Sequence, residues 1–426
     1  MCPGTPSILS VPGHTLHRRQ IMNGVSGEPL DEVIVAVYRG PRSYTGEDSA
    51  EIFCHGNPVI ISGILEALTE RGFRPADPGE FTLRAFLNGK MDLTRAEAVN
   101  EIVRSHTDRS RSLALARLAG SIERRVTAVK EMLVGVLAAI EVRIDYADEY
   151  HYGQGAEESA RIDGQDSPLL KTIAEVESEL QRLLGTFHTG RIIQQGASVV
   201  LAGRTNAGKS TFFNLLLREE RSIVSEQHGT TRDYVDAMIS VHGIPLRVYD
   251  TAGLRASQNP VESEGMRRTE MIMQAADLIV YLVDGVQGFT DEDAVCLQQY
   301  GQKGKLLRVW NKNDVAKVPV PTGFWGLSCV SGAGLDEIVT EICRLVLGDA
   351  VPEHGEPVLD SLRQKALLER CLVALREFRH GFSAEHPLDA VTVDLREAIA
   401  CLGEITGEVT SLHVLDRVFR DFCVGK

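Results

Sequence analysis

The sequence predicts a multidomain protein of the α/β plus α class, with a small N-terminal α/β domain, a helical bundle built from two chain segments, and a second α/β domain inserted between those segments. Three observations predict this arrangement. Strand-like apolar runs precede residue 54, apolar residues recur at helical spacing on both sides of residues 191–348, and a glycine-rich loop separates a strand from a helix within that range. The 426 residues have room for these domains, and we place the boundaries at 1–92, 93–190, 191–348 and 349–426.

The N-terminal domain shows its clearest pattern after residue 30. The runs 33–37 and 52–54 are strand candidates, and residues 59–68 have helical spacing. Residues 79–93 read as a turn followed by a short helix. The first 30 residues are rich in Pro, Gly, His and Arg without a clear period, so we expect this part to be partly loop.

The helical bundle is predicted from long apolar stripes. Apolar residues at spacings of three and four run from Leu118 to Ile144 and indicate one long amphipathic helix. A further helix is indicated over 170–183, and the same spacing returns at 368–378 and 395–402. Such stripes usually form the core, so we assign these helices no chemistry.

The glycine-rich loop has the pattern of a phosphate-binding loop. It reads Gly-Arg-Thr-Asn-Ala-Gly-Lys-Ser over residues 203–210, with an apolar strand at 198–202 and a helix at 209–217. In such a loop Lys209 reaches the β- and γ-phosphate oxygens, and the Ser210 hydroxyl is offered to Mg²⁺. A chance match to a short pattern is disfavoured by the strand and helix on either side.

Two downstream motifs identify the base. Asp250-Thr251-Ala252-Gly253 follows a strand at 246–249, as suits a carboxylate near Mg²⁺ and a glycine N–H at the γ-phosphate. The second motif, after a strand at 306–310, is Asn311-Lys312-Asn313-Asp314. An aspartate there accepts two hydrogen bonds from guanine, whereas adenine has no matching pair of donors. The sequence thus predicts GTP as ligand and a Ras-like P-loop GTPase domain, with the backbone of Ser328-Cys329-Val330 near guanine O6.

The hydrolytic step needs a group other than the usual glutamine. Leu254 stands where Ras-like enzymes have the glutamine that orients the attacking water. Glu262 on the following loop is one candidate, although spacing alone favours a solvated surface carboxylate. The amide oxygen of Asn206, inside the phosphate loop, is suited to hold a cation against the phosphates.

Composition limits the partners and the compartment. The formal net charge is −14 and there is no long basic run, which disfavours tight nucleic-acid binding by the chain alone. If RNA is a substrate, we expect a partner to help hold it. The eight cysteines show no paired CxxC spacing, and no apolar run approaches a membrane span, so we expect reduced thiols and a cytoplasmic protein without membrane contact.

The full set of motifs resembles the MnmE (TrmE) family of tRNA modification GTPases. The resemblance covers nearly the whole chain and rests on the phosphate loop, the two downstream motifs, and these further segments: Tyr44-Thr-Gly-Glu-Asp48, His55-Gly56, Pro78-Gly-Glu-Phe-Thr82 through Lys90, Gly229-Thr-Thr-Arg-Asp233, and the terminal Cys423-Val-Gly-Lys426.

This resemblance implies a fuller GTP site. It adds the first switch and the residue after Ser210 to the nucleotide contacts, which are then Asn206, Ala207, Gly208, Lys209, Ser210, Thr211, Ser225, Glu226, Gln227, His228, Gly229, Thr230, Thr231 and the motifs above. It implies Mg²⁺ at Ser210 and Thr231, and K⁺ at Asn206, Ser225, Gln227 and Thr230 in place of an arginine finger. It places Glu262 in the role of positioning water and adds Arg232, Asp233 and Cys423 to the catalytic candidates. On composition alone, Cys423 reads as a small buried apolar residue.

The resemblance also implies a reaction and partners. The N-terminal domain is then folate-binding-like, and takes 5,10-methylenetetrahydrofolate or its analogue 5-formyltetrahydrofolate through Glu51, Lys90 and Lys426. The family acts as a homodimer with the flavin-dependent protein MnmG (GidA), in a heterotetramer or larger complex. Together they add an aminomethyl or carboxymethylaminomethyl group to C5 of the wobble uridine, which is position 34 of certain tRNAs.

Two other classes remain open. A ribosome-assembly GTPase of the Era or Der type shares the GTP motifs but carries basic RNA-binding modules, which the acidic balance and the split bundle disfavour. A GTP-gated scaffold without chemistry of its own is the third possibility.

Overall fold

The computed structural model describes residues 7–23, 27–145, 167–219, 221–222, 236–250, 271–301, 305–348, 356–384, 386–420, 422, 423 and 425. The chain divides into two compact units. Unit 1 contains Met1–Val103, Arg117–Lys130 and Ile399–Lys426, and unit 2 contains Arg104–Ala116 and Glu131–Ala398.

Unit 1 begins with a three-stranded antiparallel sheet in the order β1-β2-β3. Its elements are β1 (Thr15–Met22), β2 (Pro29–Tyr38), β3 (Ser49–Phe53) and, after a 3-10 turn at Ile8–Ser10, the helix α1 (Pro58–Thr69). The valines of β2 form its core with Val11. The expected strands and helix after residue 30 are confirmed.

The prediction that the first 30 residues are partly loop did not identify the strand β1. All eight residues from Thr15 to Met22 pair with β2, from Thr15 opposite Val37 to Met22 opposite Pro29. Their burial alternates between intermediate and exposed over most of the strand. The two faces differ little in polarity because arginines occupy both, and this hides the period of two that marks a strand.

A second cluster of unit 1 joins segments distant in sequence. It packs α2 (Glu80–Leu87) and α3 (Leu93–Arg104) against α17 (Leu412–Phe419). Gly79 precedes α2 with φ +70°, and a Cβ there would lie 2.9 Å from a side-chain atom of Phe422. The turn predicted before the short helix is therefore confirmed, and its glycine permits the close packing.

The long helix predicted from Leu118 to Ile144 is shorter than expected. Leu118 ends α4 (Asp108–Leu118), and α5 (Ser121–Asp145) begins after a break. Gly120 has φ +84°, and its N–H donates to the Arg117 carbonyl at 2.7 Å. A left-handed glycine ends a helix without disturbing the apolar spacing, so the stripe continued across two helices.

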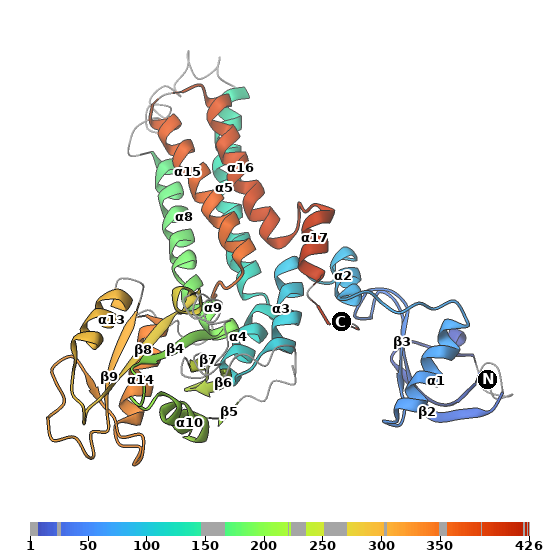
Figure 1. Ribbon diagram of the computed structural model, residues 1–426. Coiled ribbons are helices and arrows are strands. Elements are labelled where there is room, and N and C mark those ends of the chain that lie inside the picture. Colours follow the sequence, from blue (N-terminus) through green and yellow to red (C-terminus); the bar gives the residue numbers. More distant parts are fainter. Residues whose placement is uncertain are drawn as a thin grey trace, which may run out of the picture. The chain divides into compact units, whose positions relative to one another are not determined.

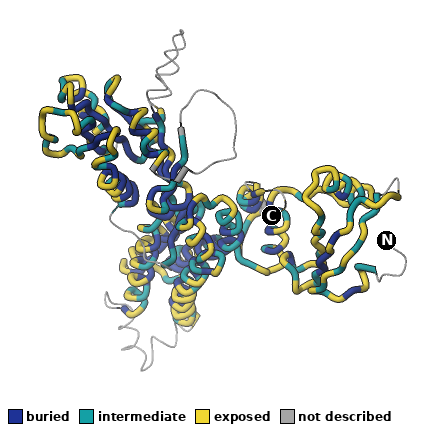
Figure 2. Tube along the Cα trace, turned by 90° about the horizontal axis from the view of Figure 1, so that it is seen from below, coloured by how far each residue is buried: buried dark blue, intermediate teal, exposed yellow. Residues whose placement is uncertain are grey.

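Unit 2 contains a helical bundle. Here α8 (Pro168–Gly185) and α15 (Leu362–Ser383) lie side by side with the parts of α5 and α16 (Leu388–Thr406) that belong to this unit (Figure 1). An ion pair from Arg396 to Glu141, at 2.5 Å, joins α16 to α5. Buried and exposed residues alternate along these helices (Figure 2). The helices predicted from apolar spacing are thus present, and that spacing faces the core.

The short α9 (Phe187–Gln195) leads from the bundle into a seven-stranded sheet of order β10-β9-β8-β4-β7-β6-β5. The strands are β4 (Ala197–Gly203), β5 (Arg221–Ser222), β6 (Asp236–Val241), β7 (Ile244–Asp250), β8 (Leu278–Asp284), β9 (Leu306–Asn311) and β10 (Trp325–Gly326). The five strands from β10 to β7 are parallel, whereas β6 and β5 pair antiparallel.

Helices cover both faces of this sheet. The helices α10 (Lys209–Glu219) and α14 (Leu335–Leu347) share one core cluster with the strands, and α13 (Asp291–Gly301) contributes Leu297 to another. The parallel strands β4, β7, β8 and β9 end at Gly203, Asp250, Asp284 and Asn311. The carboxyl ends of parallel strands share one edge, where ligands of α/β sheets bind. Across the described part of the chain, helices long and apolar enough to span a membrane are absent.

Candidate nucleotide-binding site

The phosphate loop connects β4 to α10 and depends on two glycines. Gly203 has φ +136°, and a Cβ there would lie 2.3 Å from the Leu282 carbonyl oxygen. Gly208 has φ +97°, and a Cβ there would lie 2.1 Å from Nδ2 of Asn311. Asn206 also has a left-handed backbone, with φ +64°. The loop is therefore shaped by residues that tolerate positive φ and close packing.

Lys209 is held at the mouth of this loop. Its Nζ donates to the carbonyl oxygens of Gly203 at 2.9 Å and Arg204 at 2.7 Å, and the residue is 7% exposed. A buried ammonium next to backbone N–H groups at a helix N-terminus suits phosphate oxygens. The role predicted for Lys209 from spacing agrees with this geometry.

Two oxygens meet beside the loop in a way that fits Mg²⁺. Ser210 is an exposed residue in the first turn of α10, and its Oγ donates to Oδ2 of Asp250 at 2.6 Å. Asp250 ends β7 and is 4% exposed. A hydroxyl and a carboxylate adjacent to a phosphate cradle are hard oxygen ligands, the kind that Mg²⁺ prefers.

The Asn311 side chain connects the phosphate loop to the segment around Cys329 through two hydrogen bonds. Its side chain is buried, Nδ2 donates to the Ala207 carbonyl at 2.8 Å, and Oδ1 accepts from the Cys329 N–H at 3.3 Å. Burial, together with the charge of Asp314, raises the pKa of the Cys329 thiol to about 12 against the opposing hydrogen bond to Asn311. The Cys329 side chain is therefore a neutral thiol at neutral pH, and the Cys329 backbone N–H makes the hydrogen bond to Asn311.

Lys312 adopts the left-handed conformation, with φ +62°. Its Nζ contacts Oδ2 of Asp284 at 2.6 Å, and Oδ1 of Asp284 accepts from the Val286 N–H at 2.9 Å. Burial favours the neutral form of the Asp284 carboxyl, but these hydrogen bonds outweigh it and hold its pKa below the ordinary value. Asp284 is thus a buried carboxylate in its charged form.

These groups enclose one pocket of about 980 Å³. It is lined by Gly203, Thr205, Asn206, Gly208, Lys209, Ser210, Thr211, Asn311, Lys312, Asp314, Val315, Cys329 and Val330. Four predicted nucleotide contacts of the described chain lie outside this lining: Ala207, Asp250, Asn313 and Ser328. Ala207 is buried, the buried Ser328 accepts at its Oγ from the Ser331 N–H at 3.3 Å, and Asn313 is exposed, with its N–H donating to the Leu327 carbonyl. The structure therefore brings the phosphate loop together with Asn311, Lys312 and Asp314, and it places Asp250, the described residue of the second motif, in contact with Ser210.

A second group of predicted site residues lies outside the described residues. These are Ser225, Glu226, Gln227, His228, Gly229, Thr230, Thr231, Arg232, Asp233, Thr251, Ala252, Gly253, Glu262 and Lys426. Their roles stay predictions.

The two described residues of the predicted folate set lie in unit 1, around the connection from β2 to β3. Glu51 on β3 accepts a hydrogen bond from the Tyr38 hydroxyl at 3.1 Å, which raises the pKa of that tyrosine. Lys90 Nζ donates to the Pro41 carbonyl at 2.8 Å. An exposed carboxylate on β3, and an ammonium that follows α2 and reaches the loop between β2 and β3, are compatible with a ligand that has both a donor edge and an anionic tail.

Cys423 is exposed, and its carbonyl accepts from the Gly79 N–H at 3.4 Å. The interpretation of Cys423 as a small buried apolar residue is therefore wrong. The carbonyl contact places the cysteine backbone beside the start of α2.

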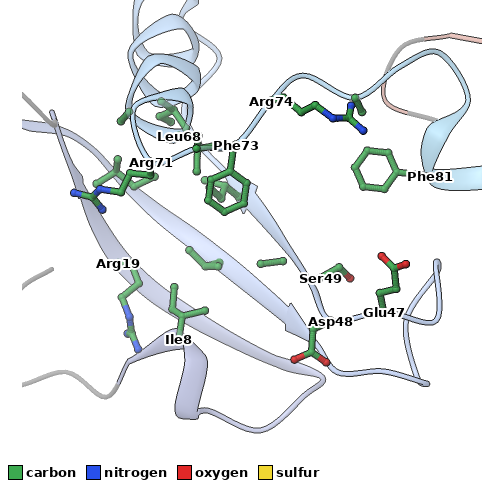
Figure 3. A pocket seen from close by; sticks show the side chains of 18 of the residues that line it. Ile8, Arg19, Glu47, Asp48, Ser49, Leu68, Arg71, Phe73, Arg74 and Phe81 are labelled. Carbon is green, nitrogen blue, oxygen red and sulfur yellow. The ribbon is translucent and has the colours of Figure 1, made fainter. Parts of the chain in front are cut away.

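Unit 1 also contains a larger cavity, of about 1350 Å³, between the small sheet and α1. Figure 3 shows Phe73 projecting into it, with Arg19 and Arg71 at one end and Asp48 and Glu47 at the other. Its lining contains neither of the predicted folate residues of the described chain. Size alone therefore does not mark the nucleotide site, which is the smaller pocket with the convergent phosphate loop.

The sequence predicted no individual role for Arg204 and Thr205 of the phosphate loop, and it did not point to Val315 or Asp284. Thr205 and Val315 line the pocket, and Arg204 supplies a carbonyl to Lys209. Asp284 holds Lys312 from the end of β8. The available signal was the run Leu278–Asp284, a wholly buried strand that ends in an acid at the ligand-binding edge of the sheet.

Comparison with known proteins agrees with the motifs. Residues 93–423 match the family described as the MnmE helical domain, and residues 4–90 match the GTP-binding protein TrmE N-terminus. The tRNA modification GTPase MnmE of Carboxydothermus hydrogenoformans is 37% identical over 429 residues, covering 98% of this chain and 91% of that protein. The protein of the same name from Moorella thermoacetica is 38% identical over 434 residues, covering 99% and 91%.

Solved structures with similarity include Era of Aquifex aeolicus bound to GDP and AlF₄⁻, which is 25% identical over 42% of this chain and 66% of its own, with a TM-score of 0.29. The G domain of the T. maritima FeoB iron transporter is 23% identical over 35% of this chain and 98% of its own, with a TM-score of 0.28. The near full-length relatives and the two family matches decide the assignment. The chain belongs to the MnmE (TrmE) family of tRNA modification GTPases.

Proposed function

We propose that the protein is a K⁺-dependent GTPase that acts in the modification of C5 of the wobble uridine, position 34 of certain tRNAs, to aminomethyl and carboxymethylaminomethyl forms. The observation that carries the GTPase part is the pocket in which Asp314 and Lys312 are joined through Asn311 to the phosphate loop. The tRNA part is supported by membership of the MnmE family.

The chain's own residues account for nucleotide binding. Asp314 lines the pocket and accepts from the guanine N1–H and 2-amino group, while Lys209 contacts the phosphate oxygens. Ser210 and Thr231 would hold Mg²⁺, and Asp250 orients the Ser210 hydroxyl through their 2.6 Å hydrogen bond. When bound, Mg²⁺ neutralises charge on the β- and γ-phosphates.

Asn206 is central to the proposed dependence on K⁺. It is exposed and lines the pocket, and its left-handed backbone is the conformation that an asparagine tolerates best among residues with a Cβ. We place K⁺ against its amide oxygen, together with Ser225, Gln227 and Thr230. The cation would supply the positive charge that an arginine finger gives elsewhere.

Glu262 is the proposed water-positioning residue. The Leu254 side chain has no hydrogen-bonding group, so another residue must orient the attacking water, and the carboxylate of Glu262 is suited to accept its proton. Glu262→Ala is expected to leave GTP affinity nearly unchanged and to lower the turnover number by about a hundredfold or more. Turnover equal to that of the unchanged protein would return Glu262 to the role of a solvated surface residue.

The test of the cation mechanism compares hydrolysis in K⁺ and in Na⁺ at equal ionic strength. We expect the rate to be about tenfold or more higher in K⁺. Asn206→Gly removes the amide but keeps a residue that adopts positive φ, and it should abolish the difference. The control, Asn313→Ala, removes an exposed amide on the base side and should keep it. Equal rates for the unchanged protein in the two salts would refute the mechanism.

The one-carbon donor and the partners form the outer part of the proposal. A reduced folate, 5,10-methylenetetrahydrofolate, would bind through Glu51, Lys90 and Lys426. Because the chain is acidic, it would bind tRNA with the help of the flavin-dependent MnmG, in a complex that it forms as a cytoplasmic homodimer. Calorimetry with 5-formyltetrahydrofolate tests the first step. We expect binding by the unchanged protein and at least about tenfold weaker binding by Glu51→Gln. Equal binding by both proteins would remove Glu51 from the folate site.

A further inference from the structure

Asp284 stands at the end of β8 with both carboxylate oxygens engaged. Its backbone is the register partner of Asn311 on β9. Oδ1 accepts from the Val286 N–H at 2.9 Å and Oδ2 contacts Lys312 Nζ at 2.6 Å, while the Asp284 side chain is 8% exposed. The carboxylate is therefore fixed from the interior and presents one oxygen to the lysine.

The surroundings leave little freedom at this point of the sheet. The Gly285 N–H donates to the Asn311 carbonyl at 2.9 Å, and a Cβ on Gly285 would lie 2.6 Å from that carbonyl oxygen and 2.6 Å from Nε1 of Trp310. The ends of β8 and β9 are thus in close backbone contact. A shift of Asp284 would move the strand that ends in Asn311.

Asp284 contacts the nucleotide pocket through Lys312. It follows the buried Asn311 directly, has φ +62°, and lines the nucleotide pocket with a side chain that is 35% exposed. A non-glycine residue at this φ is strained by about 1 kcal/mol or more and persists only where neighbours hold it. Hydrogen bonds from the N–H groups of Val315 at 3.1 Å and Ala316 at 2.9 Å to the Lys312 carbonyl hold its backbone, and the ion pair with Asp284 holds its side chain. The carbon chain of Lys312 then forms part of the pocket wall.

We propose that Asp284 is a positioning residue of the nucleotide site, which acts through Lys312 and sets how long a guanine nucleotide stays bound. The inference rests on the proposed GTPase function and goes beyond it, because it assigns control of nucleotide release to a residue that contacts no nucleotide. Loss of the Asp284 charge frees the Lys312 side chain, so the wall of the base pocket loosens. The phosphate loop keeps its own contacts, which do not include Asp284.

The test measures release of a fluorescent GDP analogue from the full-length protein. Asp284→Asn keeps the side-chain shape and removes the charge, and we expect dissociation to become about tenfold faster. Lys312→Met removes the ammonium partner of the same ion pair and should increase the dissociation rate by a similar factor. The matched control is Asp291→Asn, an exposed acid at the start of α13, which should leave release unchanged.

The double variant distinguishes positioning from a merely structural role. If Asp284 acts through Lys312, then Asp284→Asn changes release by less than about twofold in the Lys312→Met background. Multiplication of the two effects would overturn the inference, and so would a lower unfolding temperature for Asp284→Asn with unchanged release. Failure of the unchanged protein to bind GDP at all would instead overturn the GTPase proposal on which the inference rests.

Discussion

Asn311→Ala is expected to weaken both the fold around the nucleotide pocket and nucleotide binding. The Asn311 side chain is 2% exposed and connects three segments, since it donates to the Ala207 carbonyl at 2.8 Å and accepts from the Cys329 N–H at 3.3 Å. Alanine removes both bonds and leaves a buried carbonyl and a buried N–H without this partner.

The size of the effect follows from those two bonds. A buried polar group that loses its partner costs about 1–3 kcal/mol, and the 3.3 Å bond is long enough to belong at the lower end. We therefore expect the free energy of unfolding to fall by about 3 kcal/mol. The affinity for GDP should fall as well, by about tenfold or more, because the phosphate loop and the base pocket are no longer joined.

Tryptophan fluorescence during urea unfolding measures this change where it occurs. The two tryptophans of the chain, Trp310 on β9 and Trp325 on β10, belong to the same sheet. Asn313→Ala is the control, since it removes an exposed amide from the same motif and should cost less than about 0.5 kcal/mol. The reasoning is refuted if Asn311→Ala and Asn313→Ala have the same unfolding free energy and the same GDP affinity.

Three further changes have defined outcomes. Asp314→Asn replaces an acceptor by a donor at the guanine edge, so competition assays should show preference shifting from GTP towards xanthosine triphosphate; unchanged preference would exclude Asp314 from base recognition. Gly208→Ala should abolish GDP binding in a fluorescence titration, because its Cβ would lie 2.1 Å from Nδ2 of Asn311 at φ +97°; retained affinity would contradict the close packing. Hydrogen bonds led by Arg74 lower the pKa of Glu80 from 4.5 to about 2, so its contribution of roughly 1 kcal/mol is present above pH 4.5 and is lost towards pH 2. The free energy of unfolding of the full-length protein, measured between pH 4.5 and pH 2, should show this loss. Glu80→Gln should be less stable at neutral pH, and its stability should lack this contribution to the pH dependence.

Local patterns predicted the elements that carry a single clear signal. The run 198–202, the helix from Lys209 and the strand before Asn311 all occur where spacing indicated, because an apolar strand, a glycine loop and a helix each leave their mark within a few residues. The same locality explains why the three nucleotide motifs could be assembled without a structure. Parallel strands bring their carboxyl ends to one edge whatever lies between them.

The errors arose where tertiary packing decides. The strand from Thr15 to Met22 has arginines on both faces, and only its pairing with β2 defines it. The stripe from Leu118 to Ile144 crosses Gly120, whose left-handed backbone is invisible to a count of apolar positions. Asp284 has no motif around it, and its importance appears only when β8 is laid beside β9. Local sequence patterns indicate the secondary structure that each segment prefers, whereas tertiary packing determines which segments are in contact.

The most direct test of the proposed function is mass spectrometry of wobble-uridine nucleosides in tRNA from cells that lack this protein. We expect loss of the 5-aminomethyl and 5-carboxymethylaminomethyl forms, and their return when the unchanged gene is restored. The Gly208→Ala gene, whose protein we expect not to bind GTP, should not restore them. Unchanged nucleosides in the deletion strain would contradict the account and would favour a GTPase whose output is ribosome assembly.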